Sequence, residues 1–207
     1  MMKQPKVLIV MPCGENVKST TVGHLGHLLI SYPPGMISFG VCEGATAATQ
    51  NTACETIKNN KQFTHLMLID SDQTFPPTIL EALIRRDKDI VGIPYRARYD
   101  LHQRFHFPLD LNNPDVSMIR PIGEDPGDRR GLVPVAALPS GLMLIKRMVI
   151  DVLSHPYFFM TYGDEPKDDM SNDINFCLKA RAKGFRVYAD LDLAYEVGHL
   201  AQEELRW

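Results

Sequence analysis

The stretch HLMLIDSDQTF, from His65 to Phe75, decides the fold of this 207-residue chain and the place of its chemistry. The apolar run Leu66 to Ile69 is typical of a buried strand, and two aspartates, Asp70 and Asp72, follow it directly. In open α/β folds, ligands bind at the carboxyl ends of the strands. We therefore expect the sheet to present both carboxylates at its binding edge.

The composition is that of an ordinary globular protein. Apolar residues make up 44% of the chain and charged residues 23%, and no segment is low in complexity. A chain of 207 residues is long enough for one good hydrophobic core, so we expect a single domain, 1–207. The formal net charge of -3 gives no general attraction to nucleic acid.

The cysteines and apolar runs disfavour several other classes. The four cysteines are Cys13, Cys42, Cys54 and Cys177, and no two of them form a C-x-x-C motif. This spacing favours reduced thiols over a zinc ribbon or a disulfide framework. The apolar run Val7 to Met11 is short, and the stretch from Gly141 to Leu153 is broken by Lys146 and Arg147. We therefore expect neither a signal peptide nor a stable membrane span, and a cytoplasmic location.

Apolar runs alternate with helical patterns along most of the chain. The predicted strands are Lys6–Met11, Met36–Cys42, Leu66–Ile69, Asp89–Pro94, Val133–Leu138, Leu142–Ile145 and Phe185–Tyr188. The predicted helices span 45–59, begin at Phe75-Pro76-Pro77, span 146–153, and run from Ser171 to Gly184. This order predicts a Rossmann-like α/β domain with a mostly parallel mixed sheet and helices on both faces.

Two segments fall outside this pattern. His24 and His27 lie three residues apart, but Gly23 and Gly26 beside them favour a glycine-rich loop or helix start over a metal site. The segment from 95 to 131 is rich in charge, aromatics and turn residues, and loops of that length are usually functional or mobile. Its basic residues suit a diphosphate or an anionic acceptor, although a solvated loop is the better interpretation of Arg104 and the two histidines; they are Arg96, Arg98, His102, Arg104 and His106.

The Asp-x-Asp pair suits metal-assisted glycosyl transfer. A nucleotide-sugar donor leaves as a diphosphate, whose developing charge is best neutralised by a divalent cation on carboxylates. Such hard oxygen ligands suit Mn²⁺ or Mg²⁺. Alone the motif is weak, because two aspartates in a turn also serve as helix caps.

The same residues also fit phosphoryl transfer. Asp70-Ser71-Asp72-Gln73-Thr74 is similar to the signature of haloacid-dehalogenase phosphatases, in which Asp70 would attack phosphorus and Asp72 would act as acid and base. The segment GDEPKD at 163–168 is similar to that family's late acidic magnesium element. The context disfavours this hypothesis, because that family's aspartate strand normally opens the domain, whereas two predicted strands and a helix precede it here.

Four segments together resemble family 2 glycosyltransferases with the GT-A fold, especially the short forms of phages and bacteria. They are LMLIDSDQTFPPTILEALI, DKDIVGIPYRAR, PSGLMLIKRMVIDVL and SNDINFCLKARAKGFRVYADLDLAYEVGHL. The resemblance covers nearly the whole chain. For a phage protein, the expected location becomes the host cytoplasm.

This resemblance implies a role for each acidic residue. Asp72 would bind the metal, Asp70 would lie near the metal and the donor ribose, and His199 would complete the metal shell. Asp173 would be the catalytic base that removes the acceptor hydroxyl proton. From spacing alone, Asp173 is equally well explained as a first-turn charge on the helix dipole, and a lone histidine such as His199 seldom binds a metal.

The expected donor contacts follow from position and resemblance. They are Pro12, Gly14, Glu43, Gln50, Asn51, Asp70, Ser71, Arg96 and Gly141. Gly141 would let the backbone approach a ligand closely. Two departures from the family stand out: Gln50 replaces a frequent arginine, and Asn172-Asp173 replaces the usual Glu-Asp pair, which leaves Asp169 as a substitute base.

The sequence therefore predicts a metal-dependent, inverting glycosyltransferase that uses Mn²⁺ or Mg²⁺ and a nucleoside-diphosphate sugar, with UDP the family's commonest carrier. Residues 1–94 would form the nucleotide-sugar-binding half and residues 95–207 the acceptor and catalytic half. The acceptor stays open among a glycan, a lipid carrier, a protein and a modified DNA base.

Three other functions stay as alternatives to glycosyl transfer. They are the phosphatase with Asp70 as nucleophile, a non-catalytic nucleotide-sugar binder, and a sugar-1-phosphate nucleotidyltransferase. The last is disfavoured, because Met11–Thr20 lacks the glycine-rich, basic loop that holds a triphosphate.

Overall fold

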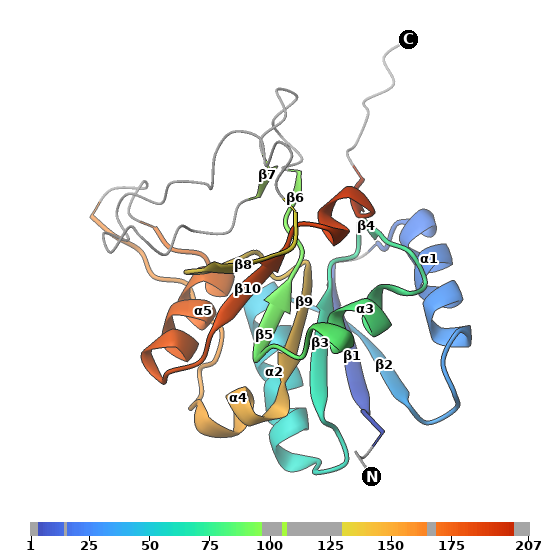
Figure 1. Cartoon of the computed structure of the whole chain (residues 1–207). Coiled ribbons are helices and arrows are strands. Elements are labelled where there is room, and N and C mark those ends of the chain that lie inside the picture. Colours follow the sequence, from blue (N-terminus) through green and yellow to red (C-terminus); the bar gives the residue numbers. More distant parts are fainter. Residues whose placement is uncertain (1–3, 15, 97–104, 107–129, 165–168, 201–207) are drawn as a thin grey trace.

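The computed structural model describes residues 4–14, 16–96, 105–106, 130–164 and 169–200. Within these ranges, a seven-stranded sheet has the order β2-β1-β3-β9-β5-β10-β8 (Figure 1). Its strands are β1 (Val7–Cys13), β2 (Ile37–Glu43), β3 (His65–Ile69), β5 (Ile90–Gly92), β8 (Leu132–Val135), β9 (Leu142–Lys146) and β10 (Val187–Asp190). Two small ribbons pair β4 (Gln73–Thr74) with β11 (Gly198–His199) and β6 (Tyr95–Arg96) with β7 (Phe105–His106).

The sheet is mixed and mostly parallel, as predicted. β1 runs parallel to β2 and β3, and β5 runs parallel to β10. β9 is antiparallel to both β3 and β5, and β8 is antiparallel to β10. The register pairs Cys13 with Glu43, so the chain leaves β1 and β2 at the same edge of the sheet. That edge is where the predicted donor contacts after these strands were expected.

Helices cover both faces of the sheet, which confirms the predicted layering (Figure 1). They are α1 (Ser19–Ile30), α2 (Thr46–Asn59), α3 (Ile79–Arg86), α4 (Arg147–Val152), α5 (Asn172–Ala182) and the 3₁₀ helix η3 (Leu193–Tyr195). Side chains of β1 alternate between two buried clusters, with Leu8 and Val10 in one and Ile9 and Met11 in the other. The first cluster includes α2, α4 and α5, and the second includes α1, α3 and η3.

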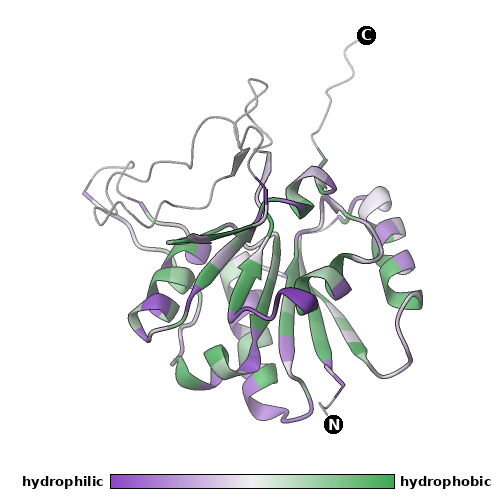
Figure 2. Cartoon of the chain, viewed as in Figure 1, coloured by the Kyte–Doolittle hydropathy of each residue, from purple (hydrophilic) through white to green (hydrophobic). Residues whose placement is uncertain are grey.

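The hydropathy of the chain follows this layering. Figure 2 shows hydrophobic strands in the middle of the fold and helices that carry hydrophilic residues on part of their surface. Cys13, Cys54 and Cys177 are buried, and Cys54 and Cys177 are free thiols in the described part of the chain. None of the described helices is both long and apolar enough to cross a membrane.

Helix α1 was not expected at full length, because glycines lower the helix propensity of this segment. Gly23 and Gly26 both lie inside it. Each costs about 1 kcal/mol relative to alanine in a helix. Burial of Leu25 and Leu28 against the sheet offsets this cost, so tertiary packing overrides local propensity.

Two predicted boundaries also shift. The helix expected from Phe75-Pro76-Pro77 begins at Ile79, whose N–H donates to the Pro76 carbonyl in a preceding turn (3.0 Å). The strand expected to reach Leu138 ends at Val135. Beyond it the chain turns to pack the Leu138 side chain on Gly92, where a Cβ would collide with it.

Candidate active site

A cavity of about 280 Å³ lies at the carboxyl edge of β1 and β3, next to the start of α5. It is lined by Pro12, Cys13, Gly14, Gly44, Thr46, Asp70, Ser71, Asp72, Tyr95, Ser140, Asn172 and Asp173. The fold thus brings six of the predicted site residues to one cavity; they are Pro12, Gly14, Asp70, Ser71, Asp72 and Asp173.

A larger hollow of about 420 Å³ lies between β8, β10 and the end of α5. Arg181, Phe185 and Arg186 are among its lining residues. Within the part of the chain that the structure describes, none of the predicted site residues lines it, and no carboxylate or histidine does. We therefore place the candidate active site in the smaller cavity, where the ionisable side chains converge.

Asp70 follows β3 and is held from two sides. Its N–H donates to the carbonyl of Gly141 (2.8 Å), and the Tyr95 hydroxyl donates to its Oδ2 (3.3 Å). Burial raises the pKa of Asp70 to about 6, and the negative charges of Asp72 and Asp173 add to this rise. A carboxyl group with such a pKa changes protonation state close to neutral pH, which is characteristic of functional sites.

Gly141 has a structural reason that differs from the predicted one. A Cβ at this position would lie 2.7 Å from Asp70 Oδ2 and would collide with the Tyr95 hydroxyl. The glycine therefore allows close packing of Asp70 and Tyr95 on the backbone. Gly141 is not among the lining residues of the cavity, so the predicted direct ligand contact is replaced by a supporting role.

Asp72 and His199 come together although they are far apart in sequence. β11 pairs with β4 so that His199 lies opposite Gln73, and the Leu200 N–H donates to the Asp72 carbonyl (2.9 Å). His199 Nε2 lies 3.3 Å from Asp72 Oδ1, and both side chains are nearly buried. The His199 ring also packs edge-on against Tyr95, with ring centroids 5.0 Å apart.

Asp173 lies in the first turn of α5, where the sequence placed it. Its Oδ1 accepts hydrogen bonds from the Ser171 hydroxyl and from the Ile174 N–H (2.9 Å for the latter). Its Oδ2 has no hydrogen-bond partner in the described part of the chain. Asp173 therefore has a fixed orientation at the cavity and a free oxygen that could accept a proton.

Gln50 supports the cavity without lining it. The side chain is fully buried, its Nε2 donates to Ser140 Oγ (2.9 Å), and its Oε1 accepts from the Asn172 amide. Ser140 and Asn172 both line the cavity, and neither was predicted as a contact. Both could have been predicted from the sequence, because Ser140 lies in the PSG segment and Asn172 in the SND segment of the family resemblance. Tyr95 was also missed, because its role depends on packing against Asp70.

Two other predicted contacts, Asn51 and Glu43, do not reach the cavity. The amide of Asn51 is occupied by backbone groups: it donates to the carbonyls of Ala47 and Phe158 and accepts from the N–H groups of Tyr157 and Phe158. Asn51 thus fixes the chain around 157–158 and has no amide group left for a nucleotide. Glu43 is exposed and is not a lining residue, although the adjacent Gly44 is.

Several predictions lie outside the described residues. They concern the Arg96 side chain, Arg98, His102, Arg104, the His106 side chain and most of the acidic segment at 163–168. Asp169, the substitute base, is described; it accepts a hydrogen bond from the Gly163 N–H (3.1 Å) and is not a lining residue.

The cavity is strongly acidic. Asp70, Asp72 and Asp173 line it, and no lysine, arginine or histidine of the described residues is among its lining side chains. In the described ranges, no group of three or more His, Cys, Asp or Glu residues has the arrangement of a complete metal site. A cation bound between Asp72 and His199 would therefore need further ligands from a bound molecule or water.

Comparisons with known proteins agree with this fold. No protein-family model and no curated protein sequence matches the chain. Solved structures do match: A197 from STIV has 13% identity over 98% of this chain and 97% of that chain, with a TM-score of 0.60. GalNAc-T7, solved with UDP, GalNAc and Mn²⁺, has 13% identity over 99% of this chain and 45% of that chain, with a TM-score of 0.58.

A nucleotidyltransferase has a related structure. The inositol-1-phosphate CTP transferase from T. maritima has 12% identity over 98% of this chain and 91% of that chain, with a TM-score of 0.52. The chain therefore has a GT-A-like α/β fold, as the sequence resemblance implied.

Proposed function

We propose that the protein is a metal-dependent glycosyltransferase that moves a sugar from a nucleoside-diphosphate sugar to an acceptor hydroxyl. The observation that carries this proposal is the convergence of Asp70, Asp72 and Asp173 on one cavity at the carboxyl edge of a GT-A-like sheet. The similarity to GalNAc-T7, whose structure contains UDP and Mn²⁺, supports a nucleotide-sugar donor and a divalent cation.

The charge of the cavity supports the need for a cation. Three carboxylates, with no basic residue among the described lining side chains, would repel a diphosphate. Mn²⁺ or Mg²⁺ held by Asp72 and His199, with Asp70 beside them, would reverse that repulsion and stabilise the charge on the departing diphosphate. Oxygen ligands from the diphosphate itself would complete the shell, which fits a site with few protein ligands.

The proposed base is Asp173. Its free Oδ2 would accept the proton of the acceptor hydroxyl while that oxygen forms the bond to the sugar C1. The hydrogen bonds to Oδ1 from Ser171 and the Ile174 N–H hold the carboxylate in place during this step. If the acceptor oxygen attacks C1 on the face opposite the departing diphosphate while Asp173 takes its proton, the configuration at C1 would be inverted.

The neutral polar side chains suit hydroxyl groups of the donor. Ser140 accepts a hydrogen bond from Gln50, so its own proton is available to a ligand. Asn172 donates one N–H to Gln50 and retains its carbonyl oxygen and a second N–H. We infer that Gln50 orients both side chains toward the sugar or ribose.

A thermal-shift experiment tests the donor proposal. The melting temperature is measured with UDP, GDP, CDP and UDP-sugars, each with Mn²⁺ and with EDTA. We expect the nucleotides to raise the melting temperature only with Mn²⁺, through ligand linkage, with UDP compounds most effective. Asp72→Asn should lose the shift, whereas Asp151→Asn, which changes an aspartate paired with Arg147 on α4, should keep it. A full shift in EDTA would contradict the proposal.

Two further assays separate the alternatives. A phosphatase with Asp70 as nucleophile would be stabilised by beryllium fluoride, which mimics an aspartyl phosphate, and Asp70→Asn would lose that effect. A non-catalytic binder would show the Mn²⁺-dependent shift but release no UDP from any UDP-sugar, with or without an acceptor. The glycosyltransferase proposal expects slow UDP release without acceptor and no response to beryllium fluoride.

A further inference from the structure

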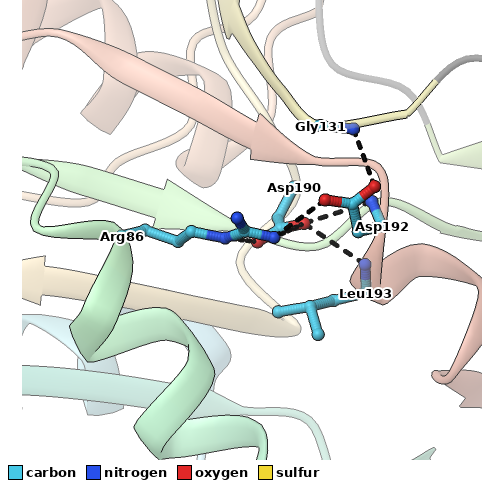
Figure 3. Close-up of polar contacts among 5 residues, drawn as sticks. All are labelled: Arg86, Gly131, Asp190, Asp192 and Leu193. Atoms are coloured by element: carbon cyan, nitrogen blue, oxygen red, sulfur yellow. Dashed lines mark hydrogen bonds and ion pairs between the residues drawn. The ribbon is translucent and has the colours of Figure 1, made fainter.

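An ion-pair cluster around a buried aspartate lies at the end of β10 (Figure 3). Asp190 is fully buried there, and its carboxylate accepts hydrogen bonds from Arg86 Nε (2.7 Å) and Nη2 (3.2 Å). Its Oδ1 also accepts from the N–H groups of Asp192 (3.1 Å) and Leu193 (3.2 Å). The buried charge is therefore fully paired, and the turn that begins η3 is fixed to it.

Asp192 connects the same arginine to a third segment. Its Oδ2 accepts from Arg86 Nη2 (2.9 Å), and its Oδ1 accepts from the Gly131 N–H (2.8 Å) (Figure 3). The Leu191 N–H donates to the Gly131 carbonyl (2.9 Å). One guanidinium group thus joins the end of α3, the turn after β10 and the residue before β8, a geometry that the planar fork of arginine allows and lysine does not.

The segment that follows this cluster in the chain carries His199, one of the proposed metal ligands. We define residues 190–199 as the C-terminal arm. It runs from Asp190 through η3 to β11, where His199 lies against Asp72. Its far end is tied to β4 by strand pairing, and its near end is tied to Arg86. β4 and Arg86, the two contacts of the arm, both lie between Asp72 and the end of α3.

We propose that Arg86 is a positioning residue that, through Asp190 and Asp192, fixes the C-terminal arm and so holds His199 against Asp72. The inference rests on the proposed function, because it assigns Asp72 and His199 to a divalent cation. Arg86 itself touches neither residue of that pair. Supporting groups of this kind orient metal ligands, and their loss weakens metal binding about 10–100-fold.

The test uses variants that separate an effect on the position of the C-terminal arm from a general loss of folding stability. Arg86→Met alone would leave Asp190 buried without a counter-charge, so the main variant is the double change Arg86→Met with Asp190→Asn. Arg86→Lys is the conservative variant. Arg147→Met is the matched control: Arg147 is also largely buried and binds Asp151 and two backbone carbonyls of the 58–60 segment, but it lies at the opposite edge of the sheet.

Two measurements are made on the full chain. The first is amide hydrogen exchange without metal, and we expect exchange of residues 193–200 to become at least tenfold faster in the double variant. The second is the affinity for Mn²⁺ in the presence of UDP, which should fall at least tenfold. Arg86→Lys should give intermediate values. Arg147→Met should leave both quantities as in the wild type, even where it lowers the melting temperature.

The outcomes distinguish this inference from the proposed function. If the folded double variant keeps wild-type exchange in residues 193–200, the positioning role is wrong, whatever the metal result. If exchange rises but Mn²⁺ affinity does not fall, while His199→Ala weakens Mn²⁺ binding, the link from Arg86 to His199 is also wrong. If the wild type binds no Mn²⁺ with UDP, the proposed function fails, and faster exchange in the arm would then support only the fixing of the arm by Arg86.

Discussion

At the scale of single residues, the surroundings of Asp70 destabilise the charged form of its carboxyl group. Its carboxyl group lies in a buried environment beside two other carboxylates, and within the described ranges it accepts one side-chain hydrogen bond, from the Tyr95 hydroxyl. Such an arrangement destabilises the ionised form and therefore the folded state at neutral pH. A bound cation would remove this penalty, so ligand binding and stability are expected to be linked.

The sign of this effect gives a pH prediction. The pKa of Asp70 is about 6 in the folded protein, above the ordinary value of 3.8 expected in the unfolded chain. Asp70 therefore stays protonated to a higher pH in the folded state than in the unfolded state. The free energy of unfolding consequently falls as the pH rises from about 4 to about 6. Asp70→Asn should stabilise the metal-free protein above pH 6, by up to about 3 kcal/mol, and should have little effect below pH 4.

Urea unfolding in EDTA across pH 4 to 8 measures this difference. Asp151→Asn serves as a control, because Asp151 is an exposed partner of Arg147. An Asp70→Asn stability gain that does not change with pH would show that burial of the Asp70 charge is not its cause.

At the scale of secondary-structure elements, the sequence pattern predicted the sheet better than its connections. Strands such as β1 and β3 were expected within one or two residues, because a buried strand is a continuous apolar run. Helix α1 was missed, because its glycines oppose helix formation and only packing against the sheet compensates. The short strands β4 and β11 carry no periodic signal, and their pairing exists only through tertiary contact.

Two glycine substitutions should have opposite effects for this reason. In α1, a Cβ at Gly23 meets no atom within 4 Å, so Gly23→Ala should stabilise the protein by about 1 kcal/mol. At Gly141 a Cβ would collide with Asp70 and Tyr95, so Gly141→Ala should destabilise it by about 2 kcal/mol. Chemical denaturation of both variants measures the difference. Equal effects would mean that close packing at Gly141 does not matter.

At the scale of the whole molecule, the active site is assembled from segments far apart in the sequence. Asp72 follows β3, Asp173 begins α5, and His199 arrives on the C-terminal arm. Each carboxylate lies at the carboxyl end of a strand or the start of a helix, which is where an α/β sheet gathers its ligands. Single substitutions can therefore separate the proposed metal binding by Asp72 from the proposed proton transfer by Asp173.

Asp173→Asn should separate chemistry from donor binding. The amide cannot take the acceptor proton, so the transfer rate should fall by at least about 100-fold. The Mn²⁺-dependent thermal shift with UDP should stay, because Asp173 is not among the proposed metal ligands. Asp72→Asn should lose both. An Asp173→Asn protein with normal transfer would rule this carboxylate out as the base, and Asp169→Asn would then be the next variant to measure.

The sequence by itself determined the layered α/β fold and the placement of Asp70, Asp72 and Asp173, because these depend on local apolar runs and on residues next to strand and helix ends. The tertiary structure decided which predicted contacts meet. It placed the Asn51 amide of α2 against the backbone of residues 157–158, put Gln50 behind Ser140 and Asn172, gave Gly141 a packing role, and brought His199 to Asp72. These arrangements depend on contacts between residues far apart in the sequence, 122 residues for Gln50 and Asn172, and no local pattern of residues encodes such contacts.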